Sequence, residues 1–318
     1  MAIIDAVTQN FESVSIEKIL PDELFRVSFH PDPHPIQGVK EFGIVQPLLL
    51  HAEGEEYRII CGFRRLQAAR TAGVTAAPAM VCRGYDRKQA VLLGFLERLS
   101  RGPLNDVERA RSIEKFSLNG WSKQELAQSL FPLLGMKFNQ MIVQQLSALL
   151  TLPEGIQLRV ARGQIYLYTA HRLCAWTPHE DRIGEWFTSL KLGANKQREL
   201  LDLMEEVARI CKIEKLELIE GLEGVRSRGN PFHVYEAWQD WLNVRRYPRL
   251  TEVQRQFEDN KARFRLPGQI QLTAPPYFEE NRYKISFPFQ SREELERYSR
   301  KLLEIARMPE LEAILKLI

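Results

Sequence analysis

The first domain of this chain is decided by the segment Cys61-Gly62-Phe63-Arg64-Arg65-Leu66-Gln67-Ala68-Ala69-Arg70. Its pattern predicts a strand that ends at Gly62 and a helix that begins directly after it. A glycine at this turn lets a ligand approach the backbone, and the first helical turn offers unpaired N–H groups and the positive end of the helix dipole. Arg64 and Arg65 add two guanidinium groups, which indicates a phosphate-binding site. A turn glycine followed by arginines that pair with surface carboxylates is the alternative interpretation.

Short apolar runs on both sides of this turn predict a small α/β unit. Residues 45–50 and 57–61 are expected to form strands on either side of a polar turn. The helix over residues 63–71 is expected to end at Gly73, and residues 79–81 return as a strand. The glycine–arginine segment therefore belongs to a strand–turn–helix unit.

The middle of the chain has the pattern of a helical bundle. Capping residues open helices within residues 86–119. An S-x-x-E capping box then predicts a helix over residues 122–130, followed by a break at Pro132 and Gly135 and a second helix over residues 137–150. Two such helices are typical of a DNA-binding helix-turn-helix, although many helical bundles bind nothing.

A third, smaller domain is expected at the C-terminal end. Residues 221–231, which are rich in glycine, are the best linker candidate, and an aromatic helix follows them. A helix–strand–strand–helix pattern fills the rest of the chain. We therefore expect an α+β multidomain protein with an α/β domain over residues 1–103, a helical domain over 104–220, a linker and aromatic helix over 221–248, and a C-terminal α/β domain over 249–318.

The bulk composition excludes several classes of protein. The chain has 318 residues, of which 44% are hydrophobic and 27% charged, as in a globular protein of two or three domains. Its net charge of +3 excludes a histone-like polycation but leaves a nucleic-acid binder open, because binding depends on where the charge lies. Four dispersed cysteines, no signal-peptide pattern and no long apolar run lead us to expect a cytoplasmic protein without a membrane partner.

Four sequence boxes resemble those of the ParB chromosome-partition family. The first two are Gly43-Ile44-Val45-Gln46-Pro47-Leu48 and Gly62-Phe63-Arg64-Arg65. The third runs from Glu97-Arg98-Leu99-Ser100-Arg101 into residues 104–110, and the fourth covers residues 152–163. Their order and spacing agree with the family over about residues 15–175.

The resemblance implies a ParB/sulfiredoxin-like domain that binds CTP, joined to a DNA-binding helix-turn-helix. It places Gly43, Gln46 and Pro47 beside the base. It places Gly62, Phe63, Arg64 and Arg65 around the triphosphate, with Glu97 and Arg101 closing the far side and Glu97 as the candidate ligand of Mg²⁺. An ion pair between Glu97 and Arg101, four residues apart on one helix, is the alternative interpretation of those two residues.

Two departures from the family pattern bear on catalysis. The family has a glutamate where this chain has Phe63, and an asparagine where it has Arg98. Magnesium takes oxygen ligands, so the loss of a carboxylate and an amide weakens the case for hydrolysis more than the case for binding. We therefore expect a protein that binds a nucleotide and is at most a slow CTPase.

Two other activities are not expected. In sulfiredoxin the reactive cysteine follows the turn glycine, whereas Cys61 precedes Gly62 on the strand, where a buried thiol is inert. No cluster of carboxylates and histidines indicates a two-metal nuclease. His30 and His34 lie in a proline-flanked loop and are interpreted as loop residues.

The expected DNA contacts lie at the start of the second helix. Helix-turn-helix proteins insert that helix into the major groove, where asparagine and glutamine pair with adenine. The candidate DNA-binding residues are Lys123, Lys137, Asn139, Gln140 and Gln144. A helical bundle that has lost DNA binding remains the alternative.

Together these features lead us to expect a CTP-dependent switch in DNA partition or a related organisation of DNA. The resemblance implies a homodimer that binds double-stranded DNA in the nucleoid, with a partition ATPase as a further candidate partner. The alternative function is a transcriptional regulator or adaptor that keeps the fold without binding a nucleotide.

Overall fold

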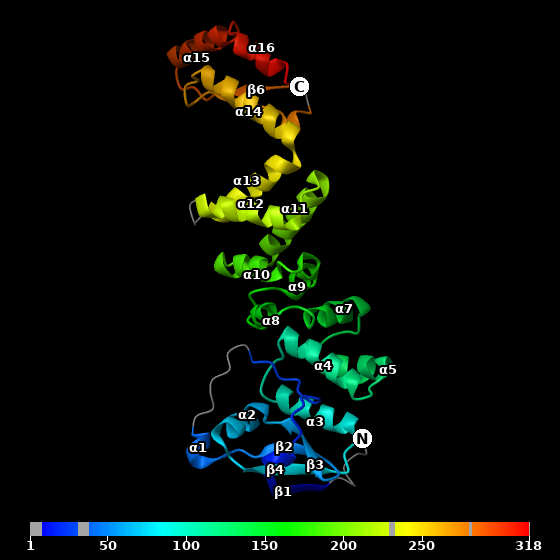
Figure 1. Cartoon of the computed structure of the whole chain (residues 1–318). Helices are drawn as coiled ribbons and strands as arrows, with labels where there is room; N and C mark the ends of the chain where they lie inside the picture. The colour runs from blue at the N-terminus through cyan, green and yellow to red at the C-terminus, as the bar shows by residue number, and fades with distance from the viewer. Residues whose placement is uncertain (1–7, 31–37, 229–232, 280–281, 318) are drawn as a thin grey trace. The chain divides into compact units, whose positions relative to one another are not determined.

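The computed structural model describes residues 8–30, 38–228, 233–279 and 282–317 (Figure 1). The chain divides into two compact units, Met1–Arg198 and Glu199–Ile318, and each is considered by itself. No helix of these described ranges is long and apolar enough to cross a membrane.

A four-stranded mixed sheet forms the start of the first unit. Its order is β1-β4-β2-β3, with β1 antiparallel to β4, β4 parallel to β2, and β2 antiparallel to β3. The sequence predicts three of these strands, but the second begins at Leu48 instead of Val45, which is 83% exposed. The strands are β1 (Thr8–Ser15), β2 (Leu48–Glu53), β3 (Glu56–Cys61) and β4 (Ala76–Arg83).

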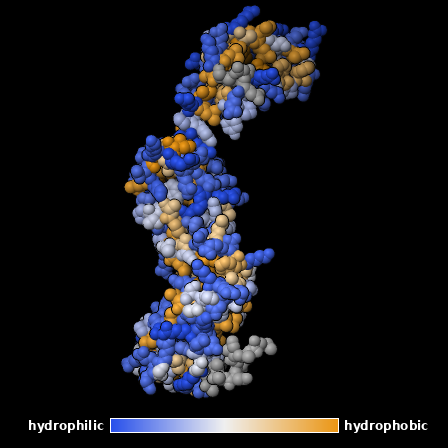
Figure 2. Space-filling view, turned by 90° about the vertical axis from the view of Figure 1, so that its right-hand side faces the viewer, coloured by the Kyte–Doolittle hydropathy of each residue, from blue (hydrophilic) through white to orange (hydrophobic). Residues whose placement is uncertain are grey.

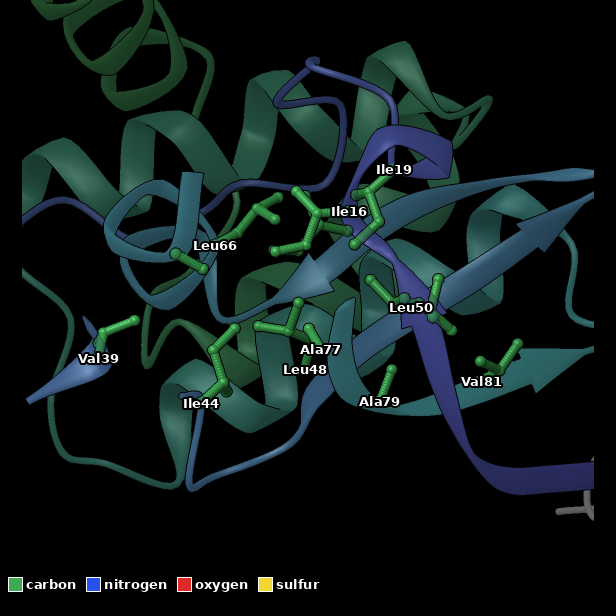
Figure 3. Packing of buried hydrophobic residues seen from close by; sticks show 13 residues of the cluster. Ile16, Ile19, Val39, Ile44, Leu48, Leu50, Leu66, Ala77, Ala79 and Val81 are labelled. Carbon is green, nitrogen blue, oxygen red and sulfur yellow. The ribbon is translucent and has the colours of Figure 1, made fainter. Parts of the chain in front are cut away.

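Helix α2 (Phe63–Ala72) covers one face of this sheet, and the short helix α1 (Val39–Phe42) precedes β2. Leu66 of α2 packs with Ile16, Leu48 and Leu50 in a buried aliphatic cluster (Figure 3). Burying one such side chain contributes about 1.5–3 kcal/mol, so the cluster holds the N-terminus of α2 firmly against the end of β3.

Gly62 joins β3 to α2 with a φ of 102°. A Cβ atom at this position would lie 2.7 Å from Cδ2 of Leu48, far inside contact distance. Both the left-handed backbone and the close approach therefore require glycine at the turn that the sequence analysis singles out.

Helices α3 (Arg87–Leu99) and α4 (Asp106–Leu118) both open with a complete capping box. The sequence predicts the cap at Asp86 and the pairing of Asn105 with Glu108, but not the part that Gln89 plays in the first box. In the second box the side chain of Asn105 accepts from the backbone N–H of Glu108, while Glu108 accepts from the N–H of Asn105. Glu108 also accepts from the N–H of Phe29, 3.1 Å away, and pairs with both ends of the Arg98 guanidinium at 2.5 and 2.6 Å. This buried carboxylate thus joins α3, α4 and the segment before residue 31.

The predicted break is confirmed at Gly135, which lies in a turn with a φ of 70°, but it is wrong at Pro132. Helix α5 (Lys123–Glu125), the π-helical turn η2 (Leu126–Leu130) and α6 (Phe131–Leu133) form one continuous helical run. The N–H of Phe131 bonds to the carbonyl of Leu126, five residues back, so Pro132 lies where the usual four-residue ladder is already interrupted and its missing N–H costs little.

The second helix of the pair, α7 (Gln140–Leu149), begins three residues later than predicted. The side chain of Asn139 accepts from the N–H of Met141 at 2.8 Å and caps the helix there. Lys137 therefore lies in the turn and not on the helix. The remaining helices of this part are α8 (Glu154–Ala161), α9 (Leu167–Leu173), η3 (Cys174–Trp176), α10 (Glu180–Ser189) and α11 (Ala194–Cys211), which runs on into the second unit.

In the second unit, the segment interpreted as a linker is helical as far as Arg228, because α12 (Lys215–Arg228) continues through it; residues 229–231 lie outside the described residues. A Cβ atom on Gly221 would lie 2.4 Å from the Trp241 ring of α13 (Val234–Arg246), so this glycine serves close helix packing instead of chain flexibility. Trp238 is buried between the same helices and donates to the carbonyl of Leu222.

The end of the chain has the expected helix–strand–strand–helix order, with one further helix after it. Phe257, Leu272 and Ile305 form part of its small core. Hydrophobic residues also reach the surface of this part of the chain (Figure 2). Among its large exposed side chains, Tyr277 is 72% and Phe289 53% exposed. The elements are α14 (Pro248–Arg263), β5 (Gln271–Thr273), η5 (Pro276–Phe278), β6 (Lys284–Ser286), α15 (Arg292–Ile305) and α16 (Pro309–Leu315), which confirms the α+β fold class.

Replacing Glu108 by alanine is expected to destabilise the first unit by about 3–5 kcal/mol, because the substitution leaves the Arg98 charge without its buried partner and removes half of a capping box. Urea unfolding of the full chain measures this change. Glu114→Ala, on the exposed side of the same helix, is the matched control and is expected to stay within about 0.5 kcal/mol of the parent protein. Equal unfolding of the two variants would contradict the role given to Glu108.

Candidate functional site

A cavity of about 240 Å³ lies at the N-terminus of α2, between the end of β3, α3 and the segment 25–30. The structure brings most of the expected nucleotide-binding residues to this cavity, and Gly43 and Pro47 are not among its lining residues. The expected residues that line it are Gln46, Gly62, Phe63, Arg64, Arg65, Glu97 and Arg101.

The two arginines of the turn have different roles. Arg65 donates from Nη1 to the backbone carbonyls of Gln46 and Pro47, at 2.5 and 2.6 Å, and so ties the turn before β2 to α2. Arg64 lines both this cavity and a larger neighbouring one of about 860 Å³, which α2 shares with α4 and α8. The alternative in which both arginines pair with surface carboxylates does not hold for Arg65, whose hydrogen bonds go to backbone carbonyls and to the sulfur of Cys61.

The charge around the smaller cavity is predominantly positive. Arg64, Arg65, Arg98 and Arg101 all line it, and Glu97 is the one carboxylate among the described lining residues. Arg98 is neutralised by Glu108, and Glu97 forms the i, i+4 ion pair with Arg101 that the sequence allows as an alternative. The unbalanced positive charge makes this cavity suited to an anion.

The described residues form no cage of their own for a magnesium ion, and ligation of Mg²⁺ by Glu97 stays a prediction. Mg²⁺ requires oxygen ligands in an octahedral arrangement. The carboxylate of Glu97 is bonded to Arg101, and across the described ranges no group of three or more histidine, cysteine or acidic side chains could hold a metal. The asparagine that the family places at position 98 is replaced by an arginine whose guanidinium faces Glu108.

His30 also lines both cavities, although the sequence analysis treats it as a loop residue. Burial lowers the pKa of His30. The positive charges of Arg64, Arg98 and Arg101 lower this pKa further, whereas the negative charge of Glu108 raises it. No spacing signal points to this residue, because its arginine neighbours lie more than thirty positions away in the sequence. His34 lies outside the described residues.

Cys61 is buried at the end of β3, with Arg65 and Arg101 against its sulfur. Burial, helped by a hydrogen bond with Glu97, raises the pKa of this thiol to about 11. The thiolate is therefore scarce at neutral pH, which agrees with the expectation that Cys61 is not a sulfiredoxin-type nucleophile.

The five residues proposed to contact DNA are all exposed, on and around the helix pair. Gln140 and Gln144 lie on α7, and Lys123 lies on α5. Lys137 precedes α7, and the side-chain oxygen of Asn139 is engaged as its cap. Two exposed apolar side chains, Phe138 at 43% and Met141 at 64%, interrupt this polar surface.

The first unit thus combines a mixed sheet, a glycine–arginine turn beside a cavity suited to an anion, and a helical bundle that follows the sheet. Residues 33–97 match the family model of the ParB N-terminal domain. This part of the chain is therefore a ParB N-terminal domain, and the resemblance found in the sequence is confirmed for it.

Curated relatives support the same assignment. The chain is 30% identical to a probable chromosome 1-partitioning protein ParB of Deinococcus radiodurans. The match extends over 147 residues, which are 46% of this chain and 48% of the relative. It is 32% identical over 145 residues to the chromosome-partitioning protein Spo0J of Thermus thermophilus, with coverages of 46% and 51%. The chain thus spans about half the length of these relatives.

A crystal structure of the C-terminally truncated chromosome-partitioning protein ParB from Caulobacter crescentus, complexed with CTP-gamma-S, is also similar. It is 24% identical to this chain and covers 56% of it and 98% of its own length, with a TM-score of 0.23. That score is too low to support an argument from its geometry.

Native Cys61 is expected to resist alkylation by iodoacetamide at pH 8. A pKa of about 11 leaves about one thiol in a thousand ionised at that pH, and the sulfur is buried. Peptide mapping by mass spectrometry measures the labelled fraction, with the urea-unfolded protein as the positive control. Rapid labelling of Cys61 in the folded protein would restore the redox interpretation.

Proposed function

We propose that this chain is a ParB-like DNA-partition protein whose first domain binds the triphosphate of a nucleotide, with CTP as the candidate that the family resemblance indicates. The observation that carries the proposal is the set of four arginines that line the cavity at the N-terminus of α2, of which Arg98 and Arg101 are paired with Glu108 and Glu97. The nucleotide would be held by Arg64, Arg101 and the first N–H groups of α2, which Gly62 leaves open to a ligand.

We further propose that binding is not coupled to rapid hydrolysis. The ring of Phe63 lies beneath the guanidinium of Arg26, whose Cζ is 5.6 Å from the ring centre, and the Phe63 side chain supplies no polar group to the cavity. Arg98 is occupied by Glu108 and by the carbonyls of Gly102 and Pro103. The described residues around the phosphates therefore offer neither the extra carboxylate nor the amide that the family has at these two positions.

The position of the two cavities supports a conformational switch. The larger one is lined by Arg64 and Gln67 of α2 on one side and by Arg111 of α4 and Gln157 of α8 on the other. A ligand that reaches from the smaller cavity into this space would contact both the sheet domain and the helices. Such a ligand would favour the arrangement in which the two are closed together.

DNA binding by the helix pair, homodimerisation and a partition ATPase partner belong to the same proposal. The helices α5 to α7 expose Lys123, Gln140 and Gln144, and the C-terminal part exposes apolar side chains such as Tyr277 and Phe289, which suit a contact with a second copy. In that setting the protein would be associated with the nucleoid.

One observation favours the alternative of a regulator or adaptor without nucleotide. Three of the four arginines at the cavity, Arg65, Arg98 and Arg101, already bond to other groups of the protein. If Arg64 and Arg101 alone cannot hold a triphosphate, the cavity is a structural remnant and the helix pair carries the function.

CTP at about one hundred times its Kd is expected to stabilise the protein by about 2.7 kcal/mol, seen as a rise in Tm. A series with CTP, ATP, GTP and UTP, each with and without Mg²⁺, measures nucleotide choice and metal dependence. Arg64→Ala is expected to abolish most of the shift, and Arg292→Ala, on the surface of α15, is the control that keeps it. Unchanged Tm values with all four nucleotides would favour the adaptor function.

Lys123→Ala is expected to weaken binding to non-specific double-stranded DNA and to lower the slope of log K against log salt by about one, because one phosphate contact is lost. Fluorescence anisotropy with a labelled duplex at increasing salt gives both values. Lys316→Ala, in the C-terminal part, removes the same charge elsewhere. An identical slope in both variants would show that α5 does not face DNA.

A further inference from the structure

His30 lies at the junction of the two cavities. Its ring, half-buried, lines both of them together with Arg64 of α2. Its other charged neighbours are Arg98 of α3, Arg101 in the turn after α3, and Glu108 of α4. A histidine in this position would be reached by any anion that Arg64 binds.

We propose that His30 is a direct ligand of the bound phosphate and that its imidazole ring is protonated when it binds. Nucleotide binding then takes up a proton at this ring. The inference rests on the proposed nucleotide site and adds a binding residue to it. It also makes affinity depend on pH in a defined direction.

The charge around the ring explains why the proton arrives with the ligand. In the free protein, burial and three guanidinium groups oppose a positive imidazolium, which keeps the pKa of His30 below its ordinary value. Glu108, the acid that favours the charged form, is already shared between Arg98 and the N–H groups of Phe29 and Asn105.

A polyphosphate would reverse this balance. Several negative charges beside the ring compensate the guanidinium groups and favour the imidazolium, which then donates from both nitrogens. The other charged residues around the two cavities leave the surroundings positive before the ligand binds; they are Glu23, Arg26, Lys40, Arg65, Glu97, Arg111 and Glu154.

The sign of the pH effect follows from this change. The pKa of His30 is low in the free protein and rises in the complex, so the complex holds more protons than its separate components between the two values. Lowering the pH through that window therefore strengthens binding, and raising it weakens binding.

Isothermal titration calorimetry with CTP tests the proposal. Titrations at pH 7.5 in buffers of different ionisation enthalpy, such as HEPES and Tris, give the number of protons taken up. The parent protein is expected to take up about one proton more than His30→Gln. Protons exchanged by the CTP phosphates contribute equally to both proteins, so they do not affect this difference. His171→Gln, an exposed histidine on α9, makes the same chemical change and is expected to match the parent.

Equal proton uptake by the parent and His30→Gln, with CTP still bound, would overturn the role of His30 and leave the nucleotide site standing. No binding by the parent would overturn both. If His30→Gln fails to fold, His30→Asn and the NMR titration of the histidine rings in the parent protein decide the question. The His30 resonance is then expected to show a higher pKa with CTP than without it, and an unchanged pKa would refute the inference.

Discussion

The pairing of Arg98 with Glu108 is the constraint on which the rest of the first unit depends. Glu108 is fully buried and holds Arg98, the N–H of Phe29 and the N–H of Asn105 at once. A carboxylate with these partners can be buried because its oxygens are satisfied, and removing any one partner would leave charge uncompensated. By fixing α3, α4 and the preceding segment together, it positions one wall of each cavity.

This pairing also changes the chemistry of the site. Position 98 carries an asparagine in the family pattern, and here it carries a cation that is paired with Glu108. Arg65 is likewise used to hold the carbonyls of Gln46 and Pro47. The arginines of this cavity thus include Arg65 and Arg98, whose bonds to the protein hold its walls together, and Arg101, which is paired with Glu97.

Local signals in the sequence predict the elements well where the interactions are themselves local. The boxes at Asp86, Asn105 and Ser122 form because each joins residues three positions apart, and Gly62 lies at the predicted turn. The predictions are wrong at Pro132 and in the supposed linker. At Pro132 a π-helical turn removes the need for an N–H, and Gly221 is required by the Trp241 ring of another helix. Neither reason can be read from neighbouring residues.

The sequence by itself determined the glycine–arginine turn, the order of sheet and helices and the family to which the first domain belongs, because each depends on short spacings along the chain. Only the tertiary structure decided which arginines face the cavity, that Glu97 is bonded to Arg101, and that His30 lies among three guanidinium groups. Phe29 and Glu108 are 79 positions apart in the chain, and such contacts form only when the whole unit has folded.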